Sequence, residues 1–132
     1  MSSIFTRIIN GEIPSYRVAE NEEFFAFLDI NPLAKGHALV IPKKEVDYIF
    51  DIDDALYSRL FVFAKEVARA IEEVVACERI GLSVVGLEVP HAHIHLITIN
   101  NVKDMSFAKP RIVMTSEEMN QLAESISSVF KV

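Results

Sequence analysis

The most regular hydrophobic pattern in the chain lies in its middle. Apolar residues recur every three or four positions, at 56, 60, 64, 67, 71 and 74. This spacing predicts one long amphipathic helix over 53–76. Acidic residues at 51, 53 and 54 suit the positive end of its dipole. A second amphipathic segment, 115–130, begins with the capping-box pair Thr115 and Glu118 and predicts a terminal helix.

Shorter apolar runs, rich in aromatic and β-branched residues, predict strands. They cover 15–21, 24–30, 37–43, 80–89 and 91–99, and turn residues separate them. Residues 4–9 predict a short helix. The predicted order is therefore a short helix, three strands, a long helix, two strands and a terminal helix. This order is typical of a single α+β domain over 1–132, built on an antiparallel sheet of about five strands.

Composition narrows the class of protein. A hydrophobic content of 51% with 24% charged residues is ordinary for a compact globular domain. The net charge of −6 argues against a nucleic-acid or anionic-membrane partner. No apolar run is long enough for a membrane helix, and no signal-peptide pattern is present, so we expect a cytoplasmic protein. The single cysteine, Cys77, excludes an internal disulfide and a cysteine-based zinc site.

Three of the four histidines lie at alternate positions, His91, His93 and His95. On the predicted strand 91–99 they would share one face, while Ala92 and Ile94 would point to the other. Histidine is only intermediate in its preference for burial, so such a cluster calls for a functional explanation.

Three explanations compete for this cluster. Each ring could be a hydrogen-bonded side chain at the edge of the core. Two of the rings, His91 and His93, could chelate a metal, although His91 and His95 would lie roughly 13 Å apart along a regular strand, too far for one zinc ion to bind all three. The third explanation is phosphoryl chemistry, in which one imidazole attacks phosphorus and the next contacts a phosphate oxygen or the leaving group.

The chain resembles the histidine triad (HIT) superfamily of nucleotide hydrolases and transferases. The motif is "HAHIHLI", residues 91–97, which fits the family pattern of three histidines alternating with apolar residues. The segments "IINGEIPS" (8–15), "FAFLDINP" (25–32) and "GHALVIPKK" (36–44) resemble the N-terminal half of the family in order and spacing. The resemblance therefore covers most of the chain.

The resemblance implies a role for each histidine. His93 matches the nucleophile that takes the nucleoside monophosphate, and the backbone carbonyl of His91 would hold the Nδ1–H of that ring. His95 matches the ring on the phosphate and leaving-group side. His37 matches a fourth family histidine beside the triad. Asp29 matches the acid that accepts the ribose hydroxyls, for which a carboxylate has suitable acceptor oxygens.

The resemblance also implies a nucleotide pocket. The positions that match its base-lining side chains are Ile4, Phe5, Ile8, Phe27, Leu28 and Ile30. The positions that match the phosphate cradle are Leu87, Glu88 and Val89.

Several residues depart from the family pattern. Ser3 and Thr6 stand where zinc-containing relatives carry Cys-x-x-Cys, and Glu45 replaces a histidine, so we predict no structural zinc and no other cofactor. Leu87 stands where Gly-Gln is common, which removes a side-chain amide near the phosphate.

The leading hypothesis is a hydrolase that cleaves nucleoside 5′-phosphoramidates, or related nucleoside-5′-phosphoryl bonds, through a covalent nucleotidyl-histidine intermediate. The alternatives are a dinucleoside polyphosphate hydrolase, a catalytically slow nucleotide-binding protein, and a metal-binding protein. The expected partner is a small nucleotide, with purine as the family default. The resemblance further implies a homodimer paired through the long helix and the strand near 78–88.

Overall fold

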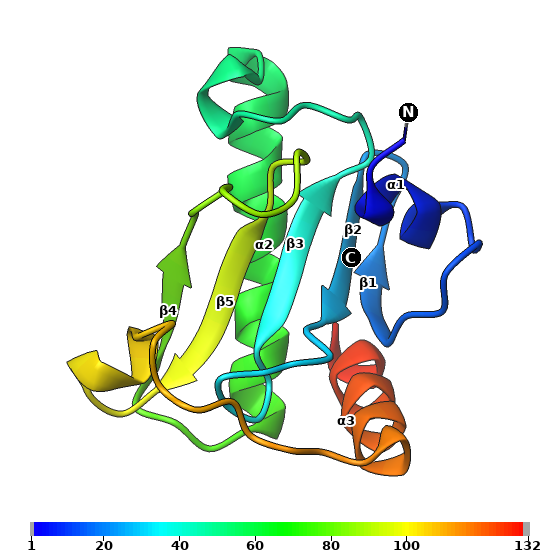
Figure 1. Ribbon diagram of the computed structural model, residues 1–132. Helices are drawn as coiled ribbons and strands as arrows, with labels where there is room; N and C mark the ends of the chain where they lie inside the picture. Colours follow the sequence, from blue (N-terminus) through cyan, green and yellow to red (C-terminus); the bar gives the residue numbers. More distant parts are fainter. Residues whose placement is uncertain (1, 131–132) are drawn as a thin grey trace.

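The computed structural model describes residues 2–130, which form a five-stranded sheet with helices on both faces (Figure 1). The elements follow the predicted order: α1 (Ile4–Ile9), β1 (Arg17–Glu20), β2 (Phe24–Leu28), β3 (Ala38–Pro42), α2 (Asp54–Val74), β4 (Arg79–Ser83), β5 (Ile94–Ile99) and α3 (Ser116–Val129). Two short 3-10 helices, η1 (Ile49–Asp51) and η2 (Val102–Met105), lie outside the prediction. The predicted α+β class is confirmed.

The sheet has the order β1-β2-β3-β5-β4, and every neighbouring pair is antiparallel. The first three strands form a meander. After α2 the chain returns to the edge as β4, and β5 then enters the sheet between β4 and β3. The two strands nearest the histidines, β3 and β5, are therefore paired although they lie far apart in the sequence.

Alternation along β2 divides the core into two clusters. Phe24, Ala26 and Leu28 face the main cluster, which the buried sides of α2 and α3 complete. Phe25 and Phe27 point to the opposite face, where they meet the short helix α1 in a smaller aromatic cluster. A strand that is buried on both faces needs an unbroken apolar run, as this one has.

The two long helices begin as the sequence predicts. The Asp53 side chain caps α2 by accepting a hydrogen bond from the Leu56 N–H at 2.9 Å. The capping box of α3 is present, because Thr115 Oγ1 accepts from the Glu118 N–H and Glu118 Oε1 accepts from the Thr115 N–H. Within residues 2–130, neither these nor the shorter helix has the length and apolar character needed to cross a bilayer.

The structure corrects the predicted strands 80–89 and 91–99, the second of which contains the triad. β4 ends at Ser83 and β5 begins at Ile94, so ten residues that were expected to be mostly extended form an irregular loop. Gly86 adopts φ +74°, and the His91 N–H donates to the Val89 carbonyl at 2.8 Å, which closes a turn around Pro90. Only His95 lies in a strand, and the first two histidines precede it.

The tight turn before β3 requires a glycine. Gly36 has φ +96°, and a Cβ atom added there would lie 3.2 Å from side-chain carbons of Ile71 and Thr98. His37 follows directly, and its backbone carbonyl accepts a hydrogen bond from the Asp29 N–H at 3.0 Å. This turn therefore sets where His37 and Asp29 lie relative to α2.

We expect Gly36→Ala to destabilise the protein more than Gly11→Ala. Both glycines have positive φ, and an L-residue there costs about 1–2 kcal/mol, but the space around Gly11 is open within 4 Å. The Gly36 variant also crowds the core, which adds roughly 1–3 kcal/mol. Urea unfolding of the two variants measures the difference. Equal free energies of unfolding would contradict the crowding argument.

Candidate active site

A cavity of about 270 Å³ lies beside the second and third histidines of the triad. His93 and His95 are both buried but keep 7% and 9% of their surface exposed. There is thus room next to both rings for a small group such as a phosphate. The residues that line this cavity are Asp29, Val85, Gly86, Leu87, Glu88, His93, His95, Phe107 and Arg111.

A backbone carbonyl determines which nitrogen of His93 is free. The ring places Nδ1 2.8 Å from the carbonyl oxygen of His91, so Nδ1 carries a hydrogen and donates it. In the neutral ring Nε2 then holds an unshared electron pair. The contact that the family resemblance implied is therefore present, although it forms within the loop before β5 instead of along a strand.

His95 has the opposite tautomer, and a backbone amide determines it. The Leu33 N–H donates to Nδ1 of His37 at 3.0 Å, so the hydrogen of the neutral His37 ring lies on Nε2. That Nε2–H lies 3.0 Å from Nδ1 of His95 and donates to it. The hydrogen of neutral His95 is therefore on Nε2. The two rings beside the cavity thus differ: His93 offers an electron pair at Nε2, and His95 offers a hydrogen-bond donor.

Burial keeps His37 and His95 neutral. We call these two hydrogen-bonded rings the relay. Removal from water lowers the pKa of His37 from 6.5 to about 3, and the neighbouring His95 and Arg111 add to the shift. Burial likewise lowers the pKa of His95 to about 4, with contributions from His93 and Arg111. At neutral pH the tautomer argument therefore applies to both rings.

His91 faces away from the cavity and is held at both ring nitrogens. It is fully buried, and its Nε2–H donates to the Pro42 carbonyl of β3 at 2.7 Å. Its Nδ1 then accepts from the Ser3 hydroxyl at 2.8 Å. Burial lowers the pKa of this ring, in keeping with its neutral form. His91 is therefore a support for His93, through its own backbone carbonyl.

A hydrogen-bonded cluster of Ser3, Thr6 and Glu45 completes this support. The Ser3 N–H donates to Glu45 Oε1 at 2.7 Å, and the Thr6 hydroxyl donates to the same oxygen at 2.6 Å. The Ser3 hydroxyl also accepts from the Thr6 N–H at 3.1 Å, which caps α1. This clasp, made of Ser3, Thr6, Glu45 and His91, ties α1 to the loop that carries the triad.

The clasp does not suit a structural zinc ion. Zinc in such sites takes thiolate, imidazole and carboxylate ligands, whereas Ser3 and Thr6 offer hydroxyls that are already hydrogen-bonded. Of the two ring nitrogens of His91, Nε2 donates to the Pro42 carbonyl and Nδ1 accepts from the Ser3 hydroxyl, so neither has a lone pair available for an ion. Hydrogen bonds therefore hold these residues together, and the residues do not form a suitable set of zinc ligands.

A second group of ligand-like atoms belongs to the relay. Atoms of Asp29, His37 and His95 lie within 4.8 Å of one another. The Leu33 amide occupies Nδ1 of His37, and a proton lies between His37 and His95. Hydrogen bonding thus already accounts for the closeness of these rings.

Asp29 lies on the wall of the cavity at the end of β2. Its Oδ1 accepts from the Asn31 N–H at 2.8 Å, and its Oδ2 lies 3.6 Å from Nε2 of His37. Burial raises the pKa of this carboxyl, and the Asn31 amide and the charge of Arg111 oppose the shift. Within residues 2–130, the second carboxylate oxygen has no closer partner than His37, so Asp29 can accept hydrogen bonds from a ligand.

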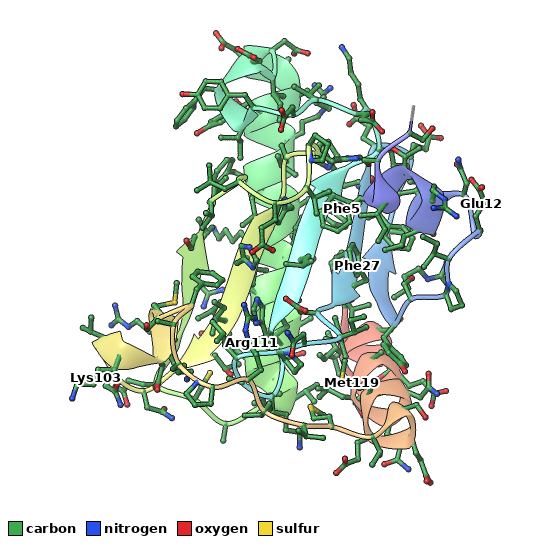
Figure 2. The ribbon with its side chains drawn as sticks, in the orientation of Figure 1. Phe5, Glu12, Phe27, Lys103, Arg111 and Met119 are labelled. Carbon is green, nitrogen blue, oxygen red and sulfur yellow. The ribbon has the colours of Figure 1, made fainter. Side chains whose placement is uncertain are left out.

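The predicted base-pocket residues are only partly brought together. Phe5 and Phe27 meet edge to face with ring centroids 5.6 Å apart, and Ile8 and Val89 pack against their cluster. Figure 2 labels Phe5 and Phe27 side by side on the α1 face of the sheet. Phe5 also contacts the His93 ring edge to face at 5.0 Å. These residues make an apolar wall beside the His93 ring, although none of them belongs to the cavity lining.

Three other predicted residues lie elsewhere. The Leu28 side chain points into the main core, on the face of the sheet opposite the histidines. Ile30 is 77% exposed after the end of β2, and Ile4 is 48% exposed on α1. Leu28 therefore cannot line a base pocket with its side chain. Leu87 and Glu88 line the cavity, whereas Val89 lies outside its lining and packs against the aromatic cluster beside α1.

Sequence reasoning missed two residues on the far wall of the cavity, Phe107 and Arg111. Both belong to the irregular connection from η2 to α3, which passes the lower end of the sheet in the view of Figure 1. The Phe107 ring meets the His95 ring edge to face at 4.9 Å. No periodic pattern or motif marks this segment, so the sequence carried no signal for them.

Comparisons with known proteins agree with this geometry. A family model described as the HIT domain matches residues 10–102. Adenosine 5′-monophosphoramidase hnt1 of Schizosaccharomyces pombe is 35% identical over 134 residues, which cover 99% of this chain and 100% of the relative. Protein hit of Bacillus subtilis is 41% identical over 101 residues, which cover 71% of this chain and 68% of the relative.

Solved structures share the fold over nearly the whole chain. A Hit-like protein from Bartonella henselae superposes with a TM-score of 0.82 at 29% identity, covering 96% of this chain and 95% of the other. A Zn-bound histidine triad family protein from Mycobacterium smegmatis gives a TM-score of 0.81 at 27% identity, covering 98% and 96%. With its triad, its fold and these matches all in agreement, the chain belongs to the HIT family.

Proposed function

We propose that the protein is a nucleotide hydrolase that cleaves nucleoside 5′-phosphoramidates, or related nucleoside-5′-phosphoryl bonds. The observation that carries the proposal is the pair of opposite tautomers beside the cavity. His93 offers an electron pair at Nε2, and His95 offers an N–H. Two relatives, from Schizosaccharomyces pombe and Saccharomyces cerevisiae, are named adenosine 5′-monophosphoramidases, which supports the choice of a P–N bond.

In the proposed first step, Nε2 of His93 attacks the α-phosphorus. A P–N bond forms to the ring, the bond from phosphorus to the leaving amine breaks, and the amine departs with one proton from solvent. The ring becomes a phosphorylated imidazolium, whose Nδ1–H remains bonded to the His91 carbonyl. A hydrogen bond from a cationic ring is stronger than from a neutral one, so this carbonyl stabilises the intermediate.

In the second step, water attacks the same phosphorus. Its oxygen bonds to phosphorus, the bond to His93 breaks, and one proton returns to solvent, which balances the proton used in the first step. The donor at His95 suits a phosphate oxygen whose negative charge grows in both steps. Asp29 is assigned to the ribose hydroxyls, and the wall of Phe5 and Phe27 to the base, with a purine favoured by its larger stacking area.

Two alternatives have specific support. A dinucleoside polyphosphate hydrolase would use the same attack and differ only in its leaving group. A nucleotide-binding protein with slow turnover is favoured by Leu87, which is 87% exposed and offers no side-chain amide to a phosphate, and by the carboxylate of Glu88 on the cavity wall.

We also propose that the protein is a homodimer. Four rings form an aromatic patch, made of Tyr48, Phe50, Tyr57 and Phe61, with successive centroids 5.4, 6.4 and 4.8 Å apart. Tyr48 is 57% exposed and Phe50 68%. The patch adjoins Val84 and Val85, which directly follow β4, and among residues 2–130 no strand pairs with the outer edge of β4. A second copy related by a two-fold axis would cover both the patch and this edge.

His93→Ala should lose about 10³-fold or more of kcat on adenosine 5′-phosphoramidate, because no other described ring beside the cavity has a free Nε2 electron pair. AMP binding should remain, since the apolar wall and Asp29 are unchanged. Single-turnover kinetics measure the first effect and calorimetry the second. Wild-type turnover in the variant would remove His93 from its role. Tight AMP binding by a wild type that cleaves none of the candidate substrates would favour the slow binding protein.

His37 and His95 should both be neutral Nε2–H tautomers at pH 7 and stay neutral down to about pH 5, because burial lowers their pKa values to about 3 and about 4. The unfolded chain binds protons near the ordinary pKa of 6.5, so the free energy of unfolding should fall as pH drops from 6.5 toward 5. Nitrogen-15 NMR and urea unfolding measure these effects. A protonated His95 at pH 6 would contradict the relay.

Leu82→Asp should convert the dimer to a monomer. Leu82 lies on the edge strand β4 and is 48% exposed, so an aspartate there would be buried without a partner at the proposed interface. Val113→Asp, at a residue that is 95% exposed on the η2–α3 connection, is the matched control and should stay dimeric. Sedimentation equilibrium measures the oligomeric state of the wild type and of both variants. A monomeric wild type would refute the dimer.

A further inference from the structure

A row of four rings runs past the cavity, and its two ends differ chemically; His93, His95 and Phe107 line the cavity, and Phe5 packs beside it. Phe5 meets His93 with centroids 5.0 Å apart, His93 meets His95 at 5.0 Å, and His95 meets Phe107 at 4.9 Å. At the Phe5 end the neighbouring side chains are apolar. At the Phe107 end the row reaches Arg111. In the proposed function, the α-phosphate position at His93 therefore lies between an apolar cluster and a cationic side chain.

Arg111 is held in place at this second end. Its Nη1–H donates to the Asn31 carbonyl at 2.8 Å, and its guanidinium carbon lies 5.8 Å from the centre of the Phe107 ring. That is its one hydrogen bond within residues 2–130, and a guanidinium has five N–H donors. Figure 2 labels Arg111 below and to the left of Phe5 and Phe27. The remaining donors are thus available to a ligand.

The charged side chains around the cavity indicate what kind of ligand these donors could bind. Among the residues that line it, Asp29 and Glu88 are acidic, and Arg111 is the only lysine or arginine. The nearest relay rings, His37 and His95, are neutral at pH 7. A second anionic group beyond the α-phosphate would therefore depend on Arg111 for a compensating charge.

We propose that Arg111, with Phe107 beneath it, forms a leaving-group subsite that selects nucleoside-5′-phosphoryl substrates with an anionic leaving group. A carboxylate or a phosphate on the leaving group would accept the free N–H donors in a charge-assisted, two-point contact. A cationic amine would instead be repelled. This inference rests on the proposed function, and it supplies the leaving-group preference that the triad alone leaves open.

Three AMP phosphoramidates of similar size test the subsite: conjugates with β-alanine (anionic), propylamine (neutral) and 1,3-diaminopropane (cationic). In the wild type, kcat/KM should decrease in that order, from the anionic to the cationic conjugate. In Arg111→Ala, kcat/KM for the anionic conjugate should fall by roughly tenfold to a hundredfold, the value of a charge-assisted contact. The neutral conjugate should change by less than about threefold, and the cationic one should be unchanged or faster.

Two further variants separate charge from structure. Arg111→Lys should keep part of the anionic preference, and Arg111→Glu should reverse it. Lys103→Ala removes a positive charge from η2, outside the cavity lining, and should leave all three values unchanged. Equal losses on all three conjugates in Arg111→Ala, with weaker AMP binding, would place Arg111 on the ribose or the α-phosphate and overturn the subsite.

A binding measurement keeps the subsite testable if the proposed hydrolysis fails. If wild type cleaves no conjugate, the proposed function is wrong, but the affinities for AMP and for α,β-methylene-ADP still report on Arg111. If the subsite is correct, Arg111→Ala weakens the binding of α,β-methylene-ADP by about tenfold or more and the binding of AMP far less. Equal weakening of the two nucleotides, or none, would overturn it.

Discussion

The site depends on two backbone groups that fix the tautomers of buried imidazoles. A neutral imidazole has one donor and one acceptor nitrogen, and it can exchange them unless a partner accepts only one arrangement. The carbonyl of His91 can only accept, and the amide of Leu33 can only donate. Together they leave an electron pair at His93 and a donor at His95. Because backbone groups carry these constraints, their positions depend on the fold of the loops.

The loop positions depend in turn on contacts between distant parts of the chain. The clasp joins α1 to His91 through the buried Ser3 hydroxyl, and α1 also carries Phe5, whose ring meets that of His93. The position of the Phe5 ring and that of the loop carrying His91 and His93 thus both depend on the same short helix. Six residues make a helix that is marginal on its own. Its order therefore comes from the hydrogen bonds of the clasp and from the burial of Phe5.

The sequence predicted those features that have a periodic signature. The period of α2, the capping box of α3 and the apolar runs of β2 and β3 each correspond to an observed element. The alternation of the histidines suggested a strand through all three, but Pro90 and the turn before it place His91 and His93 in a loop. His91 turns away from the cavity that His93 and His95 line, because tertiary hydrogen bonds to Ser3 and Pro42, which no local pattern encodes, hold its ring.

The cavity wall at Arg111 illustrates the same limit for function. The net charge of −6 is a sum over the whole surface, and charges on that surface are screened within about 8–10 Å in salt. An anionic ligand in the cavity responds instead to the few charges inside that distance, where the lower local dielectric strengthens them. One arginine, brought in by an irregular connection, can therefore decide which anion the site accepts. The overall charge argues against partners that need a broad basic surface, but it gives no information about a ligand that needs one guanidinium.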